Sequence, residues 1–263
     1  MAARETPEPA AARGFVYEGI PLRSKFLKTL LLIQIVLTPI LASCQIWGDG
    51  LYATSSSSRI LFIGNSFTYI NSGVDQEMKG LDPSLQVRRV AVGGYTLKDH
   101  WNAGDALSAI REAKWDYVVL QDQSQIPVIS TAQFVEYAAK FDREVRQTGG
   151  KTILFMTWER PDSLSVGVTT QNLADAYFNA GNQRGVKVAP VGLAFARALA
   201  NRPDLELYVQ DGHPTETGTY LAASVLYATI LDKSPLGLSY SPPSMPDAEK
   251  QFLQRTAAEF MGY

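Results

Sequence analysis

From residue 59 onward, short apolar runs alternate along the chain with longer runs in which apolar and polar positions are mixed. The short runs are continuous and rich in β-branched residues, as expected for strands that are covered on both faces. They predict strands at residues 60–63, 86–92, 117–120, 152–156 and 186–191. The longer runs predict helices at residues 74–79, 97–114, 131–147, 170–184, 193–200, 215–233 and 246–260. Repeated alternation of this kind predicts an α/β fold, a five-stranded parallel sheet with helices on both faces.

The first 58 residues do not share this pattern, and they predict a leader followed by a tether. A basic flank precedes the apolar run "TLLLIQIVLTPILAS", the layout of a secretory signal and shorter than the roughly 20 residues of a membrane span. The run ends in "LASC", which resembles a bacterial lipobox, so residues 1–44 are interpreted as a leader that is lipidated at Cys44. An uncleaved anchor helix and ordinary signal cleavage are the alternatives, and all three place the domain outside the cytoplasm, membrane-anchored or secreted. Residues 45–58 contain Gly and several Ser and predict a flexible tether.

Composition and residue counts argue against several classes of function and of binding site. The formal net charge is −2 and no long basic run is present, so the sequence has no electrostatic footprint for nucleic acid. The single cysteine excludes an internal disulfide and a CxxC site. The two histidines, His100 and His213, lie far apart without other metal-ligand spacing, so no metal site is expected. A flavin would need several backbone donors after the first strand, where "GNSFTYIN" has one glycine, so no cofactor is expected either.

Small and polar residues follow three of the predicted strands. Gly64-Asn65-Ser66 follows the first strand, Gly93-Gly94 the second and "LQDQSQ" the third, while "QDGHPTETG" precedes the long apolar helix. Ligands of parallel α/β sheets bind at the carboxyl ends of the strands, so these groups are expected at one edge. A serine hydrolase needs a serine, a histidine, an acid and oxyanion donors there. Taken alone, a serine in such a turn is more often a residue that caps the next helix than a nucleophile.

Taken together and in order, these motifs resemble those of the SGNH hydrolase superfamily, the GDSL-type esterases and lipases. The matching blocks are "GNSFT", "VVLQDQS" and "DGHPTETGTYLAA", and they resemble a bacterial branch with G-N-S-F-T at the nucleophile. The resemblance covers about residues 59–235 and makes residues 59–263 an SGNH-hydrolase-like domain. It implies a flavodoxin-like three-layer αβα sandwich, in agreement with the alternation described above.

The resemblance also implies roles for the first three strand ends. Ser66 would be the nucleophile, and its own backbone N–H would be one donor of the oxyanion hole. Gly93 would supply a second backbone N–H. The third donor should be a side-chain amide, for which this chain has Gln where better-known members have Asn. Gln123 is favoured over Gln121, which strand alternation turns toward the flank of the sheet, and Gln125 is a further alternative.

His213 would be the general base, since the competing His100 sits within a predicted helix and is expected to be structural. Asp211 would be the acid that orients it. The family pattern has Asp three residues before His, whereas Asp211 is two residues before His213. A backbone carbonyl could therefore orient the imidazole instead, and Asp204 and Glu206 are weaker substitutes for the acid.

Substrate contacts are expected from Asn65, Gln121 and Trp158. Asn65 replaces the Asp beside the nucleophile of better-known members. Trp158 follows the fourth predicted strand and could line a sugar or acyl pocket. The alternative is a Trp that covers the sheet edge, with Glu159 paired to Arg160.

The sequence thus predicts a serine esterase that forms an acyl-enzyme on an extracytoplasmic acyl ester, with acylated carbohydrate as first choice. Its partners would be a small-molecule or glycan ester and, through the leader, a membrane. A lipid esterase or acyltransferase is the second expectation. A catalytically weak glycan-binding module of the cell envelope is the alternative from another class.

Overall fold

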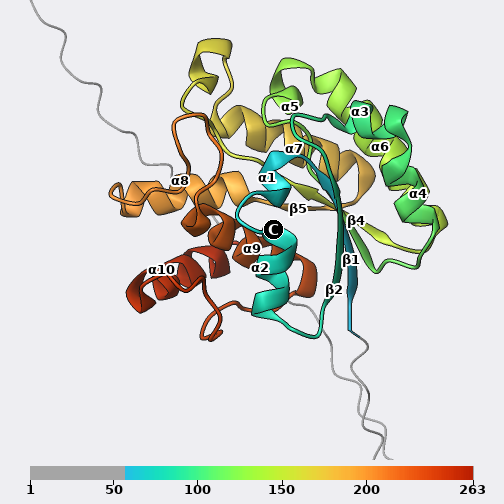
Figure 1. Cartoon of the computed structure of the whole chain (residues 1–263). Coiled ribbons are helices and arrows are strands. Elements are labelled where there is room, and N and C mark those ends of the chain that lie inside the picture. Colours follow the sequence, from blue (N-terminus) through green and yellow to red (C-terminus); the bar gives the residue numbers. More distant parts are fainter. Residues whose placement is uncertain (1–56, 263) are drawn as a thin grey trace, which may run out of the picture. The chain divides into compact units, whose positions relative to one another are not determined.

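The structure is a computed structural model that describes residues 57–262. Its sheet is entirely parallel, with the strand order β2-β1-β3-β4-β5 (Figure 1). The strands are β1 (Arg59–Gly64), β2 (Gln86–Ala91), β3 (Tyr117–Leu120), β4 (Lys151–Phe155) and β5 (Lys187–Ala189). This is the flavodoxin-like order, so the predicted fold class is confirmed. The predicted leader, Cys44 and nearly all of the tether lie outside the described residues.

Helices connect the strands and continue after the last one (Figure 1). They are α1 (Ser66–Tyr69), α2 (Val74–Leu81), α3 (Leu97–Ala103), α4 (Asp105–Arg111), α5 (Ile126–Ile129), α6 (Thr131–Gln147), α7 (Thr170–Arg184), α8 (Val191–Asn201), α9 (Glu216–Leu231) and α10 (Asp247–Ala258), with a 3₁₀ turn η1 (Ser163–Val166). In the described part of the chain, none of them combines the length and the apolar character that crossing a membrane would require.

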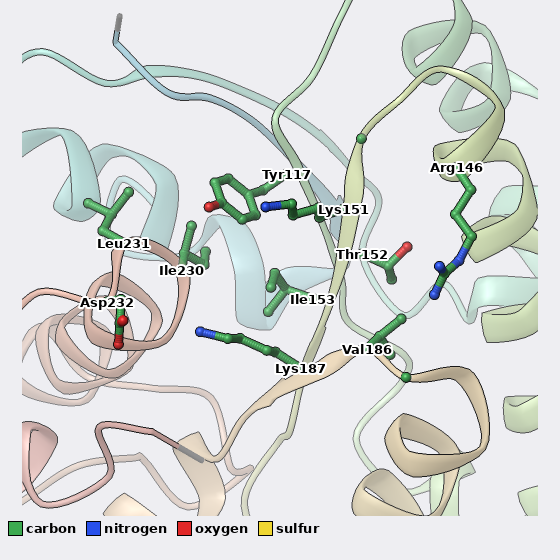
Figure 2. Close-up of a pocket in the computed structure, with 12 residues that line it drawn as sticks. Tyr117, Arg146, Lys151, Thr152, Ile153, Val186, Lys187, Ile230, Leu231 and Asp232 are labelled. Carbon is green, nitrogen blue, oxygen red and sulfur yellow. The ribbon is translucent and has the colours of Figure 1, made fainter. Parts of the chain in front are cut away.

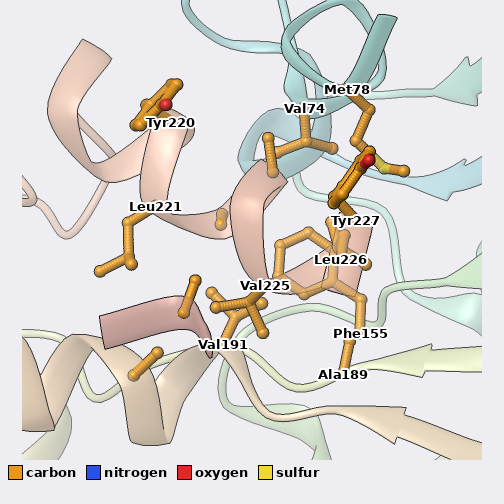
Figure 3. Close-up of a cluster of buried hydrophobic side chains, with 14 of the residues drawn as sticks. Val74, Met78, Phe155, Ala189, Val191, Tyr220, Leu221, Val225, Leu226 and Tyr227 are labelled. Carbon is orange, nitrogen blue, oxygen red and sulfur yellow. The ribbon is translucent and has the colours of Figure 1, made fainter. Parts of the chain in front are cut away.

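Two hydrophobic cores lie on opposite faces of the sheet. Successive strand residues point to opposite faces, so Ile60 and Phe62 enter one core while Leu61 and Ile63 enter the other. Helices α2, α8, α9 and α10 cover the first face, and α3, α4, α6 and α7 cover the second. Helix α9 is apolar on all sides because it is buried on all sides, against α2, α8, α10 and the sheet (Figure 3).

The observed helices and strands differ from the predicted ones at a few turns. The predicted helix 97–114 is two helices, because Gly104 adopts a left-handed conformation (φ 85°) that ends α3 and begins α4. The fifth strand stops at Ala189, since Pro190 has no N–H to extend the ladder. Helices α1 and α5 and the turn η1 were not predicted, because one turn of helix is too short to show a periodicity.

Candidate active site

Ser66 lies directly beyond the carboxyl end of β1, as the first residue of α1. Asn65 caps this helix, and its side-chain oxygen accepts a hydrogen bond from the backbone N–H of Phe67 (3.2 Å). Gly64 is required before the turn, since a Cβ there would collide with Thr68 and Gln121. The local sequence therefore places the Ser66 side chain at the sheet edge on a short, braced turn.

Ser66, His213 and Asp211 form a continuous chain of contacts. The Nε2 atom of His213 is 2.8 Å from Ser66 Oγ, and its Nδ1 atom is 2.9 Å from Asp211 Oδ1. The same carboxylate oxygen accepts the backbone N–H of His213 (3.0 Å). Gly212 makes the two-residue spacing possible, because its left-handed conformation (φ 83°) folds Asp211 back toward the imidazole.

The Asp211 carboxylate is unusual in its exposure. Its side chain is 66% exposed, whereas that of His213 is 33% exposed. Hydrogen bonds from the backbone N–H and the ring of His213 lower the pKa of Asp211, with a smaller contribution from the charge of Arg160. The carboxylate is thus held ionised beside the imidazole by contacts with His213 itself rather than by a buried network.

A pocket of about 330 Å³ opens in front of Ser66 and His213. Gly93, Gly94 and Gln123 line it from the ends of the two neighbouring strands. Neither the Ser66 N–H nor the Gly93 N–H donates a hydrogen bond to any acceptor in residues 57–262. The Gln123 side-chain oxygen accepts from the N–H groups of Gln125 (2.8 Å) and Ile126 (3.3 Å), which leaves its NH₂ group without a partner in the same range. Three unused donors therefore accompany the Ser66 hydroxyl.

No family model and no curated protein matches this chain. Among solved structures, a protein of Slackia heliotrinireducens assigned to the SGNH hydrolases is 28% identical, with a TM-score of 0.60, covering 66% of this chain and 99% of its own. A DUF4886 family protein of Bacteroides uniformis is 18% identical, with a TM-score of 0.63, covering 77% of this chain and 94% of its own.

The solved structures therefore support the resemblance of this chain to the SGNH hydrolase superfamily. The acetyl xylan esterase AlAXEase shares this fold, with 16% identity and a TM-score of 0.53 over 65% of this chain and 98% of its own. The ends of β1, β2 and β3, whose motifs suggested an SGNH hydrolase, line one pocket together with His213.

Two of the predicted substrate contacts, Gln121 and Asn65, have side-chain amides that are bonded within the protein. Gln121 is fully buried, and its side-chain oxygen accepts from the Asn65 N–H (2.8 Å) and the Thr68 hydroxyl (2.9 Å). The Asn65 amide donates to the carbonyl of Tyr95 (3.0 Å). Both amides brace the Ser66 turn. The prediction that Gln121 binds substrate is therefore wrong, whereas Asn65 lines the pocket and its contact with substrate stays a prediction.

Trp158 was also predicted to bind substrate, and this prediction is wrong. Only 1% of its surface is exposed, and its indole N–H donates to the Gly212 carbonyl (3.0 Å). Its ring stacks on Phe67 at 4.5 Å between centroids, and Phe67 meets the His213 ring edge-on at 5.4 Å. Trp158 therefore supports the Ser66 turn and the His213 loop from below, as the weighed alternative of an edge-covering Trp implies.

Arg160 is a pocket residue that the sequence analysis did not identify. Its guanidinium binds the Asp162 carboxylate through Nε and Nη2 (3.0 and 2.7 Å), and its Nη1 donates to Ser124 Oγ (3.3 Å). Glu159, its expected partner, instead accepts the Thr170 N–H at the start of α7 (2.7 Å). Arg160 follows the end of β4, and this position could have pointed to the pocket. Oppositely charged residues close together in the sequence usually form exposed ion pairs, so Arg160 is expected at the surface from the sequence alone.

The remaining polar candidates are occupied elsewhere. His100 is buried, its Nε2 lies 2.7 Å from the Gly64 carbonyl, and burial lowers its pKa, consistent with the structural role expected for it. Asp204 pairs with Arg202 (2.6 Å) and Gln125 lies 3.4 Å from Ser163. Within the described residues, no group of three or more His, Cys, Asp or Glu side chains is placed to hold a metal ion.

Asp122 joins the two segments that carry Gly93 and Gln123. One carboxylate oxygen accepts the N–H of Leu97 (3.0 Å), after β2, and the N–H of Gln123 (2.7 Å), after β3. The other oxygen is buried without a hydrogen-bond partner in the described chain. Burial raises the pKa of Asp122 from 3.8 to about 6. The folded protein therefore pays an electrostatic cost to keep this brace charged at neutral pH.

The Asp122→Asn variant is expected to lose less stability than the wild type as pH rises. Because the folded pKa lies above the ordinary value, the folded state binds the extra proton between about pH 4 and pH 6, and stability falls as pH rises through that window. Two pKa units correspond to roughly 3 kcal/mol as an upper bound. Asparagine keeps the accepting oxygen but cannot ionise. Urea unfolding near pH 4 and near pH 7 measures the difference, and identical changes in both proteins would contradict this account.

Proposed function

We propose that the chain is a serine ester hydrolase that works through a covalent acyl-enzyme. The observation that carries this proposal is the Asp211–His213–Ser66 chain of contacts, 2.9 and 2.8 Å long, at the mouth of an open pocket. A hydroxyl in this arrangement can pass its proton to the imidazole as it attacks a carbonyl carbon. The arrangement of these three side chains supports transfer of an acyl group to Ser66 and from it to an acceptor. When the acceptor is water, the reaction is a hydrolysis.

The reaction uses groups of this chain at every step. Ser66 Oγ attacks the ester carbonyl while His213 Nε2 takes its proton. The oxyanion accepts hydrogen bonds from the N–H groups of Ser66 and Gly93 and from the Gln123 amide, the three donors left unused in the pocket. His213 then protonates the leaving alcohol. Water, deprotonated by the same imidazole, attacks the acyl-Ser66 ester and releases the carboxylic acid.

The proposed substrate is an acylated carbohydrate outside the cytoplasm. The pocket is lined largely by polar or small groups, including Gln123, Ser124 and Arg160, which suit a hydroxyl-rich alcohol component. An acetyl xylan esterase has the same fold. The proposed location rests on the leader and on Cys44 as a lipidation site, both inferred from sequence.

A lipid ester is the second candidate, favoured by apolar side chains that stay exposed at the same edge. Tyr69, Val92 and Val209 are 36%, 41% and 50% exposed and belong to the segments that carry Ser66, Gly93 and His213. They could contact an acyl chain that extends beyond the small pocket. Chain length therefore separates the two candidates better than any other property of the ester.

The experiment is a comparison of substrates with the full chain. Acetate release from acetylated xylan and hydrolysis of p-nitrophenyl esters from acetate to palmitate would be measured together. We expect kcat/KM to be highest for acetyl esters and to fall as the acyl chain grows. A rise toward the long chains would support the lipid ester instead, and no hydrolysis of any ester would support the weak glycan-binding module.

The Asp211→Asn variant is expected to lower kcat with little change in KM. A buried triad aspartate is worth about 10⁴ in kcat in a well-studied protease, because it holds the imidazole tautomer and orientation. Asp211 is largely exposed, so water can replace part of its effect, and a loss of about 10²–10³ is expected. Steady-state kinetics with p-nitrophenyl acetate measures it. The matched control is Asp204→Asn, whose carboxylate binds Arg202, and equal losses in both variants would refute Asp211 as the acid.

A further inference from the structure

A second pocket lies at the opposite edge of the sheet from Ser66 (Figure 2). It has a volume of about 370 Å³ and lies where three strands begin, at Tyr117, Lys151 and Lys187. Ile153 and Ile230 form apolar walls. Because all strands are parallel, this amino edge is separated from the active site by the full length of the sheet.

Two lysine side chains in this pocket have no carboxylate partner. Neither Lys151 nor Lys187 forms an ion pair within residues 57–262. Lys187 donates only to the Thr229 carbonyl (3.3 Å), and Lys151 lies 5.8 Å from the centre of the Tyr117 ring. Both ammonium groups point to the side of the pocket where Tyr117 and Ile230 lie (Figure 2). The positive charge of this side is opposed by a single lining carboxylate, that of Asp232.

The other side of the pocket carries a buried hydroxyl and an arginine. Thr152 lines the pocket, is only 4% exposed, and its Oγ1 has no hydrogen-bond partner in the described chain. Arg146, whose charge is shared with Asp142 (2.9 Å), lines the pocket as well. Thr152 and Arg146 lie on the other side of β4 from the two lysines (Figure 2), so the lysine side of the pocket is formed without them.

The chain enters the domain at this same edge. The first strand begins at Arg59, and residues 45–58 separate it from Cys44. Fully extended, these fourteen residues span at most about 50 Å. With an anchor at or before Cys44, the amino edge is the part of the domain that the tether joins, and the active site is at the far edge.

We propose that the amino-edge pocket binds the phosphate headgroup of an anionic phospholipid. Lys151 and Lys187 would pair with the phosphate, while Ile230 and the Tyr117 ring contact the glycerol and first acyl carbons. Lysines near an anionic membrane surface are attracted by its negative potential, whereas a phosphatidylcholine surface carries no net charge. The domain would then rest on the membrane by this edge and present its active site away from the bilayer. The proposal is independent of the esterase reaction.

The test measures binding of the full chain to vesicles of phosphatidylcholine with and without phosphatidylglycerol. The leader is the same in the wild type and in each variant, so a difference between them in the increment due to phosphatidylglycerol reports the pocket lysines. We expect each of Lys151→Glu and Lys187→Glu to lower that increment about five-fold or more, given roughly 1 kcal/mol per lysine. Lys98→Glu, an exposed lysine on α3, is the matched control and should retain it. An unchanged Tm would show that the variants are folded.

Three results would overturn the proposal. The first is the absence of an increment with phosphatidylglycerol. The second is an equal loss in Lys98→Glu, which would indicate diffuse attraction without a site. The third is an increment that is unchanged in both Lys151→Glu and Lys187→Glu, which would place the attraction outside the pocket.

Discussion

Replacement of Ser66 by alanine is expected to lower kcat for p-nitrophenyl acetate by about 10⁴–10⁶, because the loss of a serine nucleophile costs about this much in other serine hydrolases. No other group can form the acyl-enzyme, and the oxyanion donors can only stabilise slow attack by water. The fold should be unaffected, since Ser66 is partly exposed and its hydroxyl bonds only His213. The two readouts are kcat from steady-state kinetics, which should fall as stated, and a Tm equal to that of the wild type.

Ser124→Ala is the matched control in the same pocket. Its hydroxyl accepts from Arg160 (3.3 Å) and does not contact His213. It should lose less than about ten-fold in kcat, the scale of one neutral hydrogen bond. Hydrolysis that survives in Ser66→Ala but stops in Ser124→Ala would move the nucleophile to the end of β3.

The second prediction with a large expected effect distinguishes the roles of the two histidines. His213→Asn should lower kcat by about 10⁴–10⁶ with an unchanged Tm, since it removes the base but leaves the fold intact. His100→Asn should do the reverse. Its ring bonds the Gly64 carbonyl at 2.7 Å in the core, so loss of that contact should destabilise the fold by about 1–3 kcal/mol.

Thermal unfolding and kinetics on the same samples would distinguish these outcomes. Activity should persist in His100→Asn at temperatures where it remains folded. A loss of kcat in folded His100→Asn, together with an active His213→Asn, would contradict the assignment of the base.

The sheet and the positions of the strand ends could be predicted because strands that are buried on both faces appear in the sequence as continuous apolar runs. Strands β1 and β3 and helices α6 and α7 lie within one residue of their predicted bounds. Ser66, Gly93 and Gln123 share one pocket for the same reason, since parallel strands bring their carboxyl ends together, and His213 joins them from the loop before α9.

Side-chain direction at the strand ends could not be predicted in the same way. Gln121 and Gln123 differ by two positions just beyond a strand, yet one braces the Ser66 turn and the other lines the pocket. Trp158 and Arg160 show the same reversal after β4. Beyond the last ladder bond the chain no longer alternates, so tertiary contacts decide which residue faces the ligand.

The most direct test of the account is reaction of the full chain with a fluorophosphonate, followed by mass spectrometry of its peptides. Activated serines attack phosphorus as they attack an ester carbonyl, so the adduct marks the nucleophile. The account predicts one adduct, on Ser66, that disappears in His213→Asn and is retained in His100→Asn. An adduct on another residue, or none in a protein that still hydrolyses esters, would contradict it.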